Sequence, residues 1–373
     1  MGARGRLGKA ALCAALLCAG ARSEASTVVE PIARLSLEGG YDSNVLYDGA
    51  SADRTGRVSP GAGLRLRDHL WSTSLEWRGD WIAYERLAPE GTWNHRGLFT
   101  LDARPTRRLE LTTALSGAWS DDPVGLALVG VFRPGRQSAL LVGGNARAEF
   151  RASRRVDVAA TLTERTVRFE DRTGGAMHAP GAELLWRATH RTSVGAGYGF
   201  GIFQGFDTRG DALAFSHALR ARARWRASRR LTVEGHAGPA LWIGAGGTAI
   251  VPEALVQALA SSRAWDLRVT ATHGLGIGST ARPGLVDSAE LGVERRFGRR
   301  FLLRGDGGIW HSGRAPRGGD SVTGWAGSGE AGVRVGGNVR LSLAATHFAR
   351  LDDVPDLRRT TVGLRVGWEL PAR

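Results

Sequence analysis

The sequence predicts an all-β protein, a transmembrane antiparallel up-and-down β-barrel of about 18 strands. Three observations predict this fold. Charged and apolar residues alternate along most of the chain after residue 25, which is the pattern of strands with two different faces. The alternating runs are longer than the roughly 5–6 residues usual in globular sheets and match tilted membrane-crossing strands. The connections between runs are alternately short and long, as in outer-membrane barrels.

The alternation is clearest in residues 75–81, where Leu75, Trp77 and Trp81 share one face and charged residues occupy the other. The segment 219–225 places three arginines on one face, and the C-terminal segment 362–370 repeats the pattern. Soluble antiparallel sheets also alternate, but the pattern here continues to the end of the chain. Tryptophans concentrate at the ends of runs, which is typical of the aromatic girdles of membrane barrels.

Eighteen runs follow one another along the chain, with 16 strands as the alternative because the twelfth and fourteenth runs are weak. We place them at 31–43, 56–68, 70–84, 93–104, 108–120, 138–152, 155–169, 178–190, 191–204, 213–227, 230–243, 249–262, 263–277, 285–297, 300–311, 323–335, 338–350 and 357–370. Short basic turns alternate with longer connections at 44–55, 121–137, 170–177, 205–212, 278–284, 312–322 and 351–356. We expect the short turns, and both termini of the barrel, in the periplasm.

Residues 1–25 have the features of a secretory signal peptide, which leaves residues 26–373 as a single barrel domain. Arg4, Arg6 and Lys9 precede an apolar run over 10–20, and we expect cleavage after Ala25. The run is shorter than the roughly 20 residues of a membrane helix. Both cysteines lie in this segment, so the mature chain has no disulfide and no thiol nucleophile. The predicted location is the outer membrane of a Gram-negative cell.

Composition excludes several other classes of protein. The chain is 42% hydrophobic and 23% charged, so it is not disordered. Its net charge of +14 comes almost entirely from arginine and first suggests nucleic acid as a partner. The arginines alternate with apolar residues and recur in turns, however, so we expect outer-membrane lipid as the partner and no nucleic acid.

The polar faces of the strands are expected to line an aqueous lumen. Charges of both signs are interspersed on these faces, so most should pair across strands. The candidate lumen and ligand residues are Arg78, Asp80, Arg268, Arg220, Arg222 and Arg224, together with Gly195 and Gly197 on the strand before the last three arginines. A hairpin that pairs Gln204 with Leu213 places the two glycines opposite the first two arginines of that strand. The guanidinium groups would then either lie over glycine or reach an anionic ligand.

The sequence gives no sign of an enzyme, a cofactor or a metal. The nine histidines are far apart and show no metal-ligand spacing, and no Gly-x-Ser-x-Gly elbow occurs. Paired acids such as Glu290 and Glu294 lie four residues apart on a strand, roughly 13 Å, which suits lumen lining better than glycosidase chemistry. We therefore predict a non-enzymatic membrane protein.

The first run ends in Tyr41, Asp42, Ser43 and Asn44, preceded by two glycines. An element of this kind resembles the end of the first strand in the porin-like outer-membrane barrels that accompany bacterial exopolysaccharide export. The resemblance covers this element, the chain length and the strand count. It implies a conduit for a polysaccharide ligand that works with a periplasmic polysaccharide-export protein. Taken without the resemblance, the element is an Asx-rich turn at a strand end.

A diffusion porin for small, anionic solutes is the alternative function. Such a channel requires a loop that folds inward and narrows the lumen, and the segment 121–137 is the best candidate for it. A surface protein without transport is a third, less favoured interpretation, because many charges are predicted to face inward.

Overall fold

The structure of the chain is a computed structural model. It describes residues 27–47, 49, 51–87, 91–122, 130–131, 137–207, 212–244, 247–278, 281–313, 321–351 and 357–370. The 18 strands are β1 (Val28–Asp42), β2 (Asp53–Arg67), β3 (Trp71–Tyr84), β4 (Thr92–Thr106), β5 (Leu109–Ser120), β6 (Ala139–Arg151), β7 (Val156–Phe169), β8 (Gly174–Arg187), β9 (Thr192–Phe206), β10 (Ala212–Arg226), β11 (Leu231–Gly244), β12 (Gly247–Ser261), β13 (Trp265–Ile277), β14 (Pro283–Phe297), β15 (Phe301–Gly313), β16 (Val322–Arg334), β17 (Val339–Arg350) and β18 (Arg358–Glu369). The predicted signal peptide lies outside the described residues.

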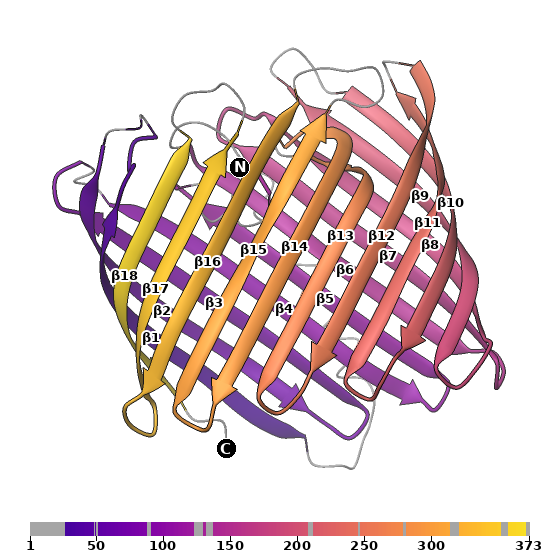
Figure 1. Ribbon diagram of the computed structural model, residues 1–373, viewed down its shortest axis with the longest axis horizontal. Coiled ribbons are helices and arrows are strands. Elements are labelled where there is room, and N and C mark those ends of the chain that lie inside the picture. The colour runs from indigo at the N-terminus through magenta and orange to yellow at the C-terminus, as the bar shows by residue number, and fades with distance from the viewer. Residues whose placement is uncertain are drawn as a thin grey trace.

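Each strand pairs antiparallel with its neighbours in the chain, and β18 returns to pair with β1 (Figure 1). The closing register joins Arg34 to Glu369 and Asp42 to Thr361. Closure satisfies the backbone of every strand on both sides, so the wall has no free edge. The predicted barrel fold and the count of 18 strands are confirmed.

The two rims of the barrel differ in their connections, and the short turns lie together at the lower rim in the view of Figure 1. None of the eight turns at this rim is longer than four residues. We call this the short-turn rim and the opposite one the long-loop rim. β1 begins and β18 ends at the short-turn rim, so the described chain enters and leaves the barrel there.

One turn solution recurs at the short-turn rim. The sequence Arg-Ala-Ser-Arg-Arg occurs twice, at 151–155 and at 226–230. In each copy the serine hydroxyl, of Ser153 or of Ser228, accepts hydrogen bonds from two backbone N–H groups further along the turn. Thr189 makes the same pair of bonds between β8 and β9. A hydroxyl that replaces missing ladder partners stabilises a tight connection. The same turn geometry thus serves three connections of this rim.

Strand boundaries agree with the prediction to within a few residues, with one clear exception. The segment 170–177 was expected as a long loop, but β8 already begins at Gly174. Gly174, Gly175 and Ala176 carry no alternating pattern, yet they pair with β7 and β9. Val167 and Ala176 are buried at this rim, so tertiary packing extends the strand where the sequence pattern ends.

The outer wall is apolar and accessible. Large hydrophobic side chains alternate with the inward-facing charges along the strands, and many of them are more than 36% exposed. Examples on the outer face are Leu75, Leu219, Val256, Leu291, Leu343 and Leu364. The tryptophans predicted at strand ends include Trp186, Trp225 and Trp368, which are also exposed on the outside. An apolar outer face around a charged interior is the arrangement of a membrane-spanning barrel.

Candidate functional site

The predicted arginine track on β10 faces the glycine stripe on β9. The register pairs Gln204 with Leu213, Gly197 with Arg220 and Gly195 with Arg222, as the hairpin argument expected. A Cβ added at Gly199 would lie 2.8 Å from the Arg220 guanidinium, so this group extends over the glycine stripe. The glycines therefore leave space along the inner wall in which long arginine side chains can lie flat.

Each arginine of the track has a carboxylate partner. Arg222 reaches over β9 to Glu183 on β8. Arg220 donates from Nε and Nη2 to Glu253 on β12, at 3.0 and 2.7 Å. Arg224 donates to Glu234 on the neighbouring strand at 3.0 Å. The predicted pairing of lumenal charges across strands is present here, and the cations of the track are offset by carboxylates.

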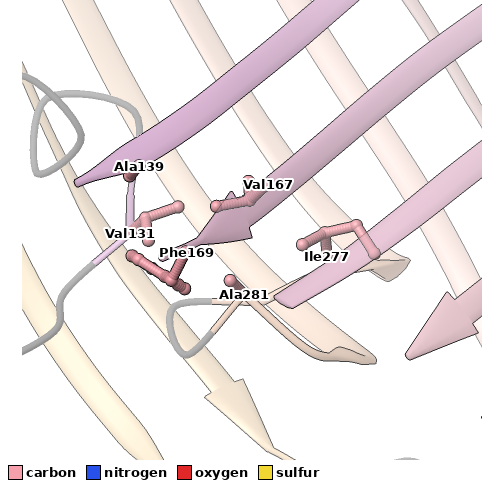
Figure 2. Packing of buried hydrophobic residues seen from close by; sticks show 6 residues of the cluster. All are labelled: Val131, Ala139, Val167, Phe169, Ile277 and Ala281. Carbon is pink, nitrogen blue, oxygen red and sulfur yellow. The ribbon is translucent and has the colours of Figure 1, made fainter. Parts of the chain in front are cut away.

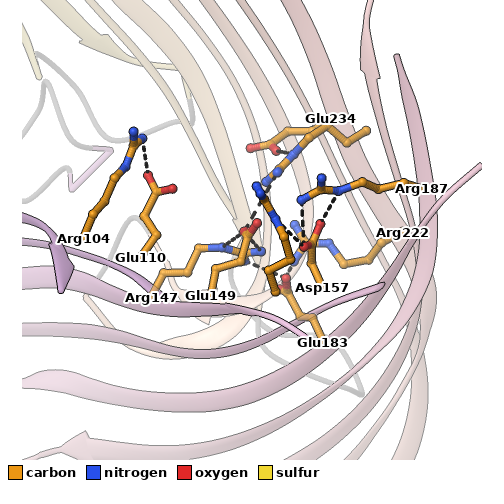
Figure 3. Close-up of polar contacts among 11 residues, drawn as sticks. Arg104, Glu110, Arg147, Glu149, Asp157, Glu183, Arg187, Arg222 and Glu234 are labelled. Atoms are coloured by element: carbon orange, nitrogen blue, oxygen red, sulfur yellow. Dashed lines mark hydrogen bonds and ion pairs between the residues drawn. The ribbon is translucent and has the colours of Figure 1, made fainter. Parts of the chain in front are cut away.

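These contacts continue into a larger network on the wall between β6 and β11 (Figure 3). Arg147 bonds both Glu149 and Glu183, at 3.0 and 2.6 Å. Nearer the short-turn rim, Arg187 binds the carboxylate of Asp157 through two nitrogens. The pairs are partly exposed, so each contributes little to the free energy of unfolding. Their effect is to hold a charged wall in one geometry.

The other side of the lumen, between β1–β5 and β15–β18, contains a large cavity. Its volume is about 990 Å³. Eight arginines line it, against four glutamates and no aspartate. The charged lining residues are Arg34, Arg65, Arg78, Arg96, Arg304, Arg334, Arg340, Arg365, Glu30, Glu76, Glu330 and Glu369. The lining of this cavity therefore has an excess of positive charge.

A second cavity of about 420 Å³ lies next to the first and shares Arg78, Arg96 and Arg304 with it. Asp80 is buried in its lining, and Arg78 donates to this carboxylate at 3.3 Å. Arg57 also lines this cavity, and its Nε is buried without a hydrogen-bond partner in the described structure. The charge of the same Asp80 carboxylate also acts on Arg96. Arg78, Asp80 and Arg268, predicted as lumen residues, all line this space.

Residues 130 and 131 of the predicted constricting segment lie inside the long-loop rim; residues 123–129 and 132–136 lie outside the described part of the chain. Val131 packs with Phe169 of β7 and Ile277 of β13, in a cluster drawn in Figure 2. Gly130 has a φ of +78°, and an added Cβ would lie 2.5 Å from Trp310 on β15. The segment thus contacts strands on different sides of the barrel, which agrees with the inward fold that the alternative function required.

The wall itself also narrows at this rim. Asp207, which follows β9, forms an ion pair with Arg282, which precedes β14, at 3.0 Å. Gly175 of β8 lies so close to Ala281 that an added Cβ would be 2.7 Å from the carbonyl oxygen of that residue. These contacts join strands that are not neighbours in the sheet. They bring two parts of the rim together and reduce the opening of the lumen.

The first connection also folds inward. Tyr47 packs with Trp310, Phe348 and Leu357 in a second buried cluster, and its hydroxyl donates to Asp122 at 2.7 Å. Burial raises the pKa of Tyr47 well above its ordinary value, with Asp122 adding to the shift. The phenol therefore stays protonated and remains a donor.

Arg359 lies at the centre of these contacts and is 2% exposed. Its guanidinium donates to Asp42 on β1 and to Asp122 after β5, and it lies 5.0 Å from the centre of the Tyr47 ring. Tyr84 donates to the same Asp122 at 3.1 Å. We call Arg359, Asp42, Asp122, Tyr47 and Tyr84 the latch. It connects the last strand, the first strand and two inward-folded connections.

The element Tyr41 to Asn44 lies at the closing seam between β1 and β18. Asp42 belongs to the latch. The Ser43 N–H donates to the Thr360 carbonyl oxygen at 2.9 Å, and the Thr360 N–H donates to the Ser43 hydroxyl oxygen at 2.8 Å. Asn44 donates to the Arg358 carbonyl and accepts from the Gly49 N–H. Tyr41 faces outward and is half exposed. The element therefore closes the barrel and starts the inward turn; it makes an Asx turn, with the Asn44 N–H bonded to Asp42.

Sequence reasoning missed the rest of the latch. Arg359 and Asp42 are 317 residues apart, so no local spacing relates them. The only signal is that Asp122 is the second residue of the longest predicted loop, 121–137, and that Tyr47 lies in the first one.

Searches for a metal site and for membrane helices give plain results for the described part of the chain. No group of three or more His, Cys, Asp or Glu residues lies close enough there to hold a metal ion. No helix in the same residues is long and apolar enough to cross a membrane.

No protein-family model and no curated protein matches the sequence. Solved structures show distant similarity. Pseudomonas aeruginosa OpdK, solved with vanillate, is 11% identical with a TM-score of 0.40, covering 91% of this chain and 98% of that chain. Acinetobacter baumannii OccAB4 is 9% identical with a TM-score of 0.41, covering 93% and 99%. The FrpB iron transporter of Neisseria meningitidis, as apoprotein, is 10% identical with a TM-score of 0.42, covering 90% and 68%.

At these TM-scores the similarity is no further evidence for the barrel fold, which is established by the register of the strands. None of these structures is described as a polysaccharide exporter, so the family resemblance drawn from Tyr41 to Asn44 finds no support among them.

Proposed function

We propose that this chain is an outer-membrane channel for small anionic solutes, with its long-loop rim held partly closed by the latch. The observation that carries this proposal is the arginine-rich cavity in the lumen, where eight arginines face four glutamates beneath an obstructed rim. The sequence pattern supports the same function as its alternative to polysaccharide export.

The membrane location follows from the outer wall. Exposed side chains such as Leu219 and Ile250, at 64% and 75%, are costly in water but favourable against lipid. Short turns face the periplasm in barrels of this kind, so the long-loop rim faces the cell exterior. Both ends of the barrel then lie on the periplasmic side, and residues 1–25 serve as the signal peptide that directs export.

The preference for anions follows from the excess of arginine. A guanidinium keeps its charge at every relevant pH and offers several N–H groups in a plane, which suits carboxylate and phosphate. Arg96, Arg334 and Arg340 line the large cavity, and the described residues give neither Arg334 nor Arg340 an ion pair. The track Arg220, Arg222 and Arg224, with Gly195 and Gly197, serves in this proposal as a neutralised wall that sets the local field.

The restriction to small solutes follows from size. The cavity near the latch has a volume of about 420 Å³. That value falls within the roughly 300–1,000 Å³ of ordinary small-molecule sites. Val131 and Tyr47 occupy the lumen above it. A solute of a few carbon atoms passes such a constriction after modest loop movement, whereas a polymer needs a continuously open path.

Solute flux into liposomes tests the proposal. We expect gluconate to enter faster than the neutral polyol mannitol through the native barrel, and faster still after Arg359→Gln. Replacing Arg96, Arg334 and Arg340 together by Gln removes three cations from the lining of the large cavity, so it lowers gluconate flux severalfold and leaves mannitol flux unchanged. Arg155, Arg229 and Arg299, in short turns, provide the matched control. Equal gluconate and mannitol flux in all variants would contradict the proposal.

Polysaccharide export, with a polysaccharide ligand and a periplasmic export protein as partner, has no contact in its favour among the described residues. It predicts loss of extracellular polymer, with polymer retained in the periplasm, when the gene is deleted. The small-solute channel predicts normal polymer in that strain. The two functions are therefore separated by one measurement on cells.

A further inference from the structure

Six of the nine histidines form a ring on the outside of the barrel at the long-loop rim. They are His95, His178, His217, His273, His311 and His347, on β4, β8, β10, β13, β15 and β17. Each lies two to five residues from the end of its strand at that rim. The inward faces of these strands carry residues of the opposite parity, such as Arg220 on β10 and Arg304 on β15, so the histidines face outward. We call this ring the histidine collar.

The remaining histidines lie elsewhere. His69 and His190 are in short turns at the other rim, and His236 pairs with the inward-facing Arg222. No described outward-facing position near the short-turn rim carries a histidine within a strand. The collar is thus confined to the leaflet that the long loops face.

Five collar histidines are held by the neighbouring strand through Nδ1. Three of them contact hydroxyls at 2.7 Å: His217 with Tyr198, His311 with Thr323 and His347 with Thr360. Two contact carboxylates: His178 with Glu164, and His273 with Asp287 at 2.5 Å. These partners orient the rings and leave Nε2 without a hydrogen-bond partner in the described part of the chain.

The sixth histidine is held by aromatic rings instead. His95 stacks between the indoles of Trp93 and Trp119, with ring centres 6.0 and 5.7 Å away, and Trp77 lies at a similar distance. The indole rings fix the orientation of this imidazole at the outer face. Trp325 stacks on His347 with ring centres 4.6 Å apart. Both clusters place tryptophan beside the collar.

We propose that the histidine collar binds the anionic phosphate groups of lipid headgroups in the leaflet around the long-loop rim. Imidazole is the side chain that becomes a cation on mild acidification, and a cationic ring with its N–H donors matches phosphate. Other charged groups on this outer face are Arg54, which pairs with Glu85, Arg168, which lies over Phe206, and Arg358, beside His347. Glu164 and Asp287 each neutralise one histidine, and the positive Arg358 already lies beside His347, which leaves His95, His217 and His311 to act on the lipid.

The inference rests on the proposed position of the barrel in a membrane. It adds that the rim selects its surrounding lipid and does so more strongly at low pH. Phosphatidylglycerol is a suitable probe, because its single phosphate charge does not change between pH 5.5 and 8.

The test uses quenching of tryptophan fluorescence by brominated lipids in phosphatidylcholine vesicles containing the full barrel. The tryptophans that contact collar histidines report the lipid beside them; they are Trp77, Trp93, Trp119 and Trp325. In the native protein, we expect the association of brominated phosphatidylglycerol, relative to brominated phosphatidylcholine, to rise about threefold or more from pH 8 to pH 5.5. With all six collar histidines replaced by Gln, we expect no change with pH. His69→Gln with His190→Gln is the matched control and should behave as the native protein does.

A second variant covers a failure of the sixfold variant to fold. Replacing only His217, His311 and His347 by Gln keeps both carboxylate pairs, and it should reduce the pH effect by about half or more, because two of the three responsive rings, His217 and His311, are lost. An inserted native barrel whose lipid preference is the same at both pH values overturns the collar alone. A native barrel that does not insert into vesicles overturns the proposed membrane channel together with the collar.

Discussion

Arg359, near the start of the last strand, donates two hydrogen bonds to Oδ2 of Asp42 at the end of the first strand, one of them from Nε at 3.0 Å. The same guanidinium bonds Asp122, which follows β5. The seam that closes the barrel and the segments that narrow its mouth therefore share one buried cation.

The latch predicts that Arg359→Gln opens the channel. Removing the cation leaves Asp42 and Asp122 buried without a charge partner, and breaking a buried pair in this way costs about 3–5 kcal/mol. We expect the inward connections to leave the lumen, so the single-channel conductance should rise severalfold in planar bilayers. Arg358→Gln changes the neighbouring, outward-facing residue and serves as the control. An Arg359→Gln barrel that folds and conducts like the native one would show that the latch does not control the opening.

The contact between Gly130 and Trp310 makes a second prediction about the constriction. Gly130 combines a positive φ with a position where a Cβ would overlap the indole, so Gly130→Val must displace the segment. We expect larger and noisier single-channel currents. Gly336, in a short turn, has nothing within 4 Å of an added Cβ, and Gly336→Val should leave the currents unchanged. Equal currents in the two variants would remove residues 130–131 from the constriction.

The arginine track predicts a change of ion selectivity. Replacing Arg220, Arg222 and Arg224 by Ala leaves Glu253 and Glu234 without their partners and Glu183 with Arg147 alone, so the wall becomes more negative. The ratio of chloride to potassium permeability, measured from the reversal potential, should fall severalfold. Changing the three glutamates to Gln should raise the same ratio. If both triple variants keep the native ratio, the track is only a structural part of the wall.

Tyr47 predicts how the mouth responds to pH. Because burial raises the pKa of Tyr47, its phenol keeps its proton in the folded protein where an exposed tyrosine would lose it. The folded state then binds more protons than the unfolded state above about pH 10, so this contribution to stability is complete below that pH and is lost above it. Titration of the Tyr47 phenol should therefore leave the conductance constant from about pH 7 to pH 9 and raise it only at higher pH. Tyr47→Phe should remove the alkaline rise; a rise that persists in this variant would assign it to another group.

The sequence predicted the wall well because strand alternation is a local property. Charge and apolarity at residues 75–81 determine which side chains face the lumen, and the hairpin from Gln204 to Leu213 determines the register of Arg220 against Gly197. Turn length then separated the two rims without reference to distant contacts.

The mouth was less predictable, because it depends on contacts between residues far apart in the chain. Asp42 belonged to an element recognised at the end of the first strand, but its partner Arg359 looks like any other arginine beside a loop. The segment 174–177 has no alternating pattern and was placed in a loop, while packing between β7 and β9 makes it a strand. The partners of the β10 arginines, on β8 and β12, likewise required the curvature of the closed barrel.

The measurement that tests the central claim most directly is the reversal potential of the purified native barrel in a planar bilayer under a potassium chloride gradient. The excess of arginine in the lumen predicts discrete, small conductance steps. It also predicts a reversal potential closer to the equilibrium potential of chloride than to that of potassium. Wide, unselective or cation-selective pores, or a protein that does not conduct at all, would contradict the proposed channel for small anions.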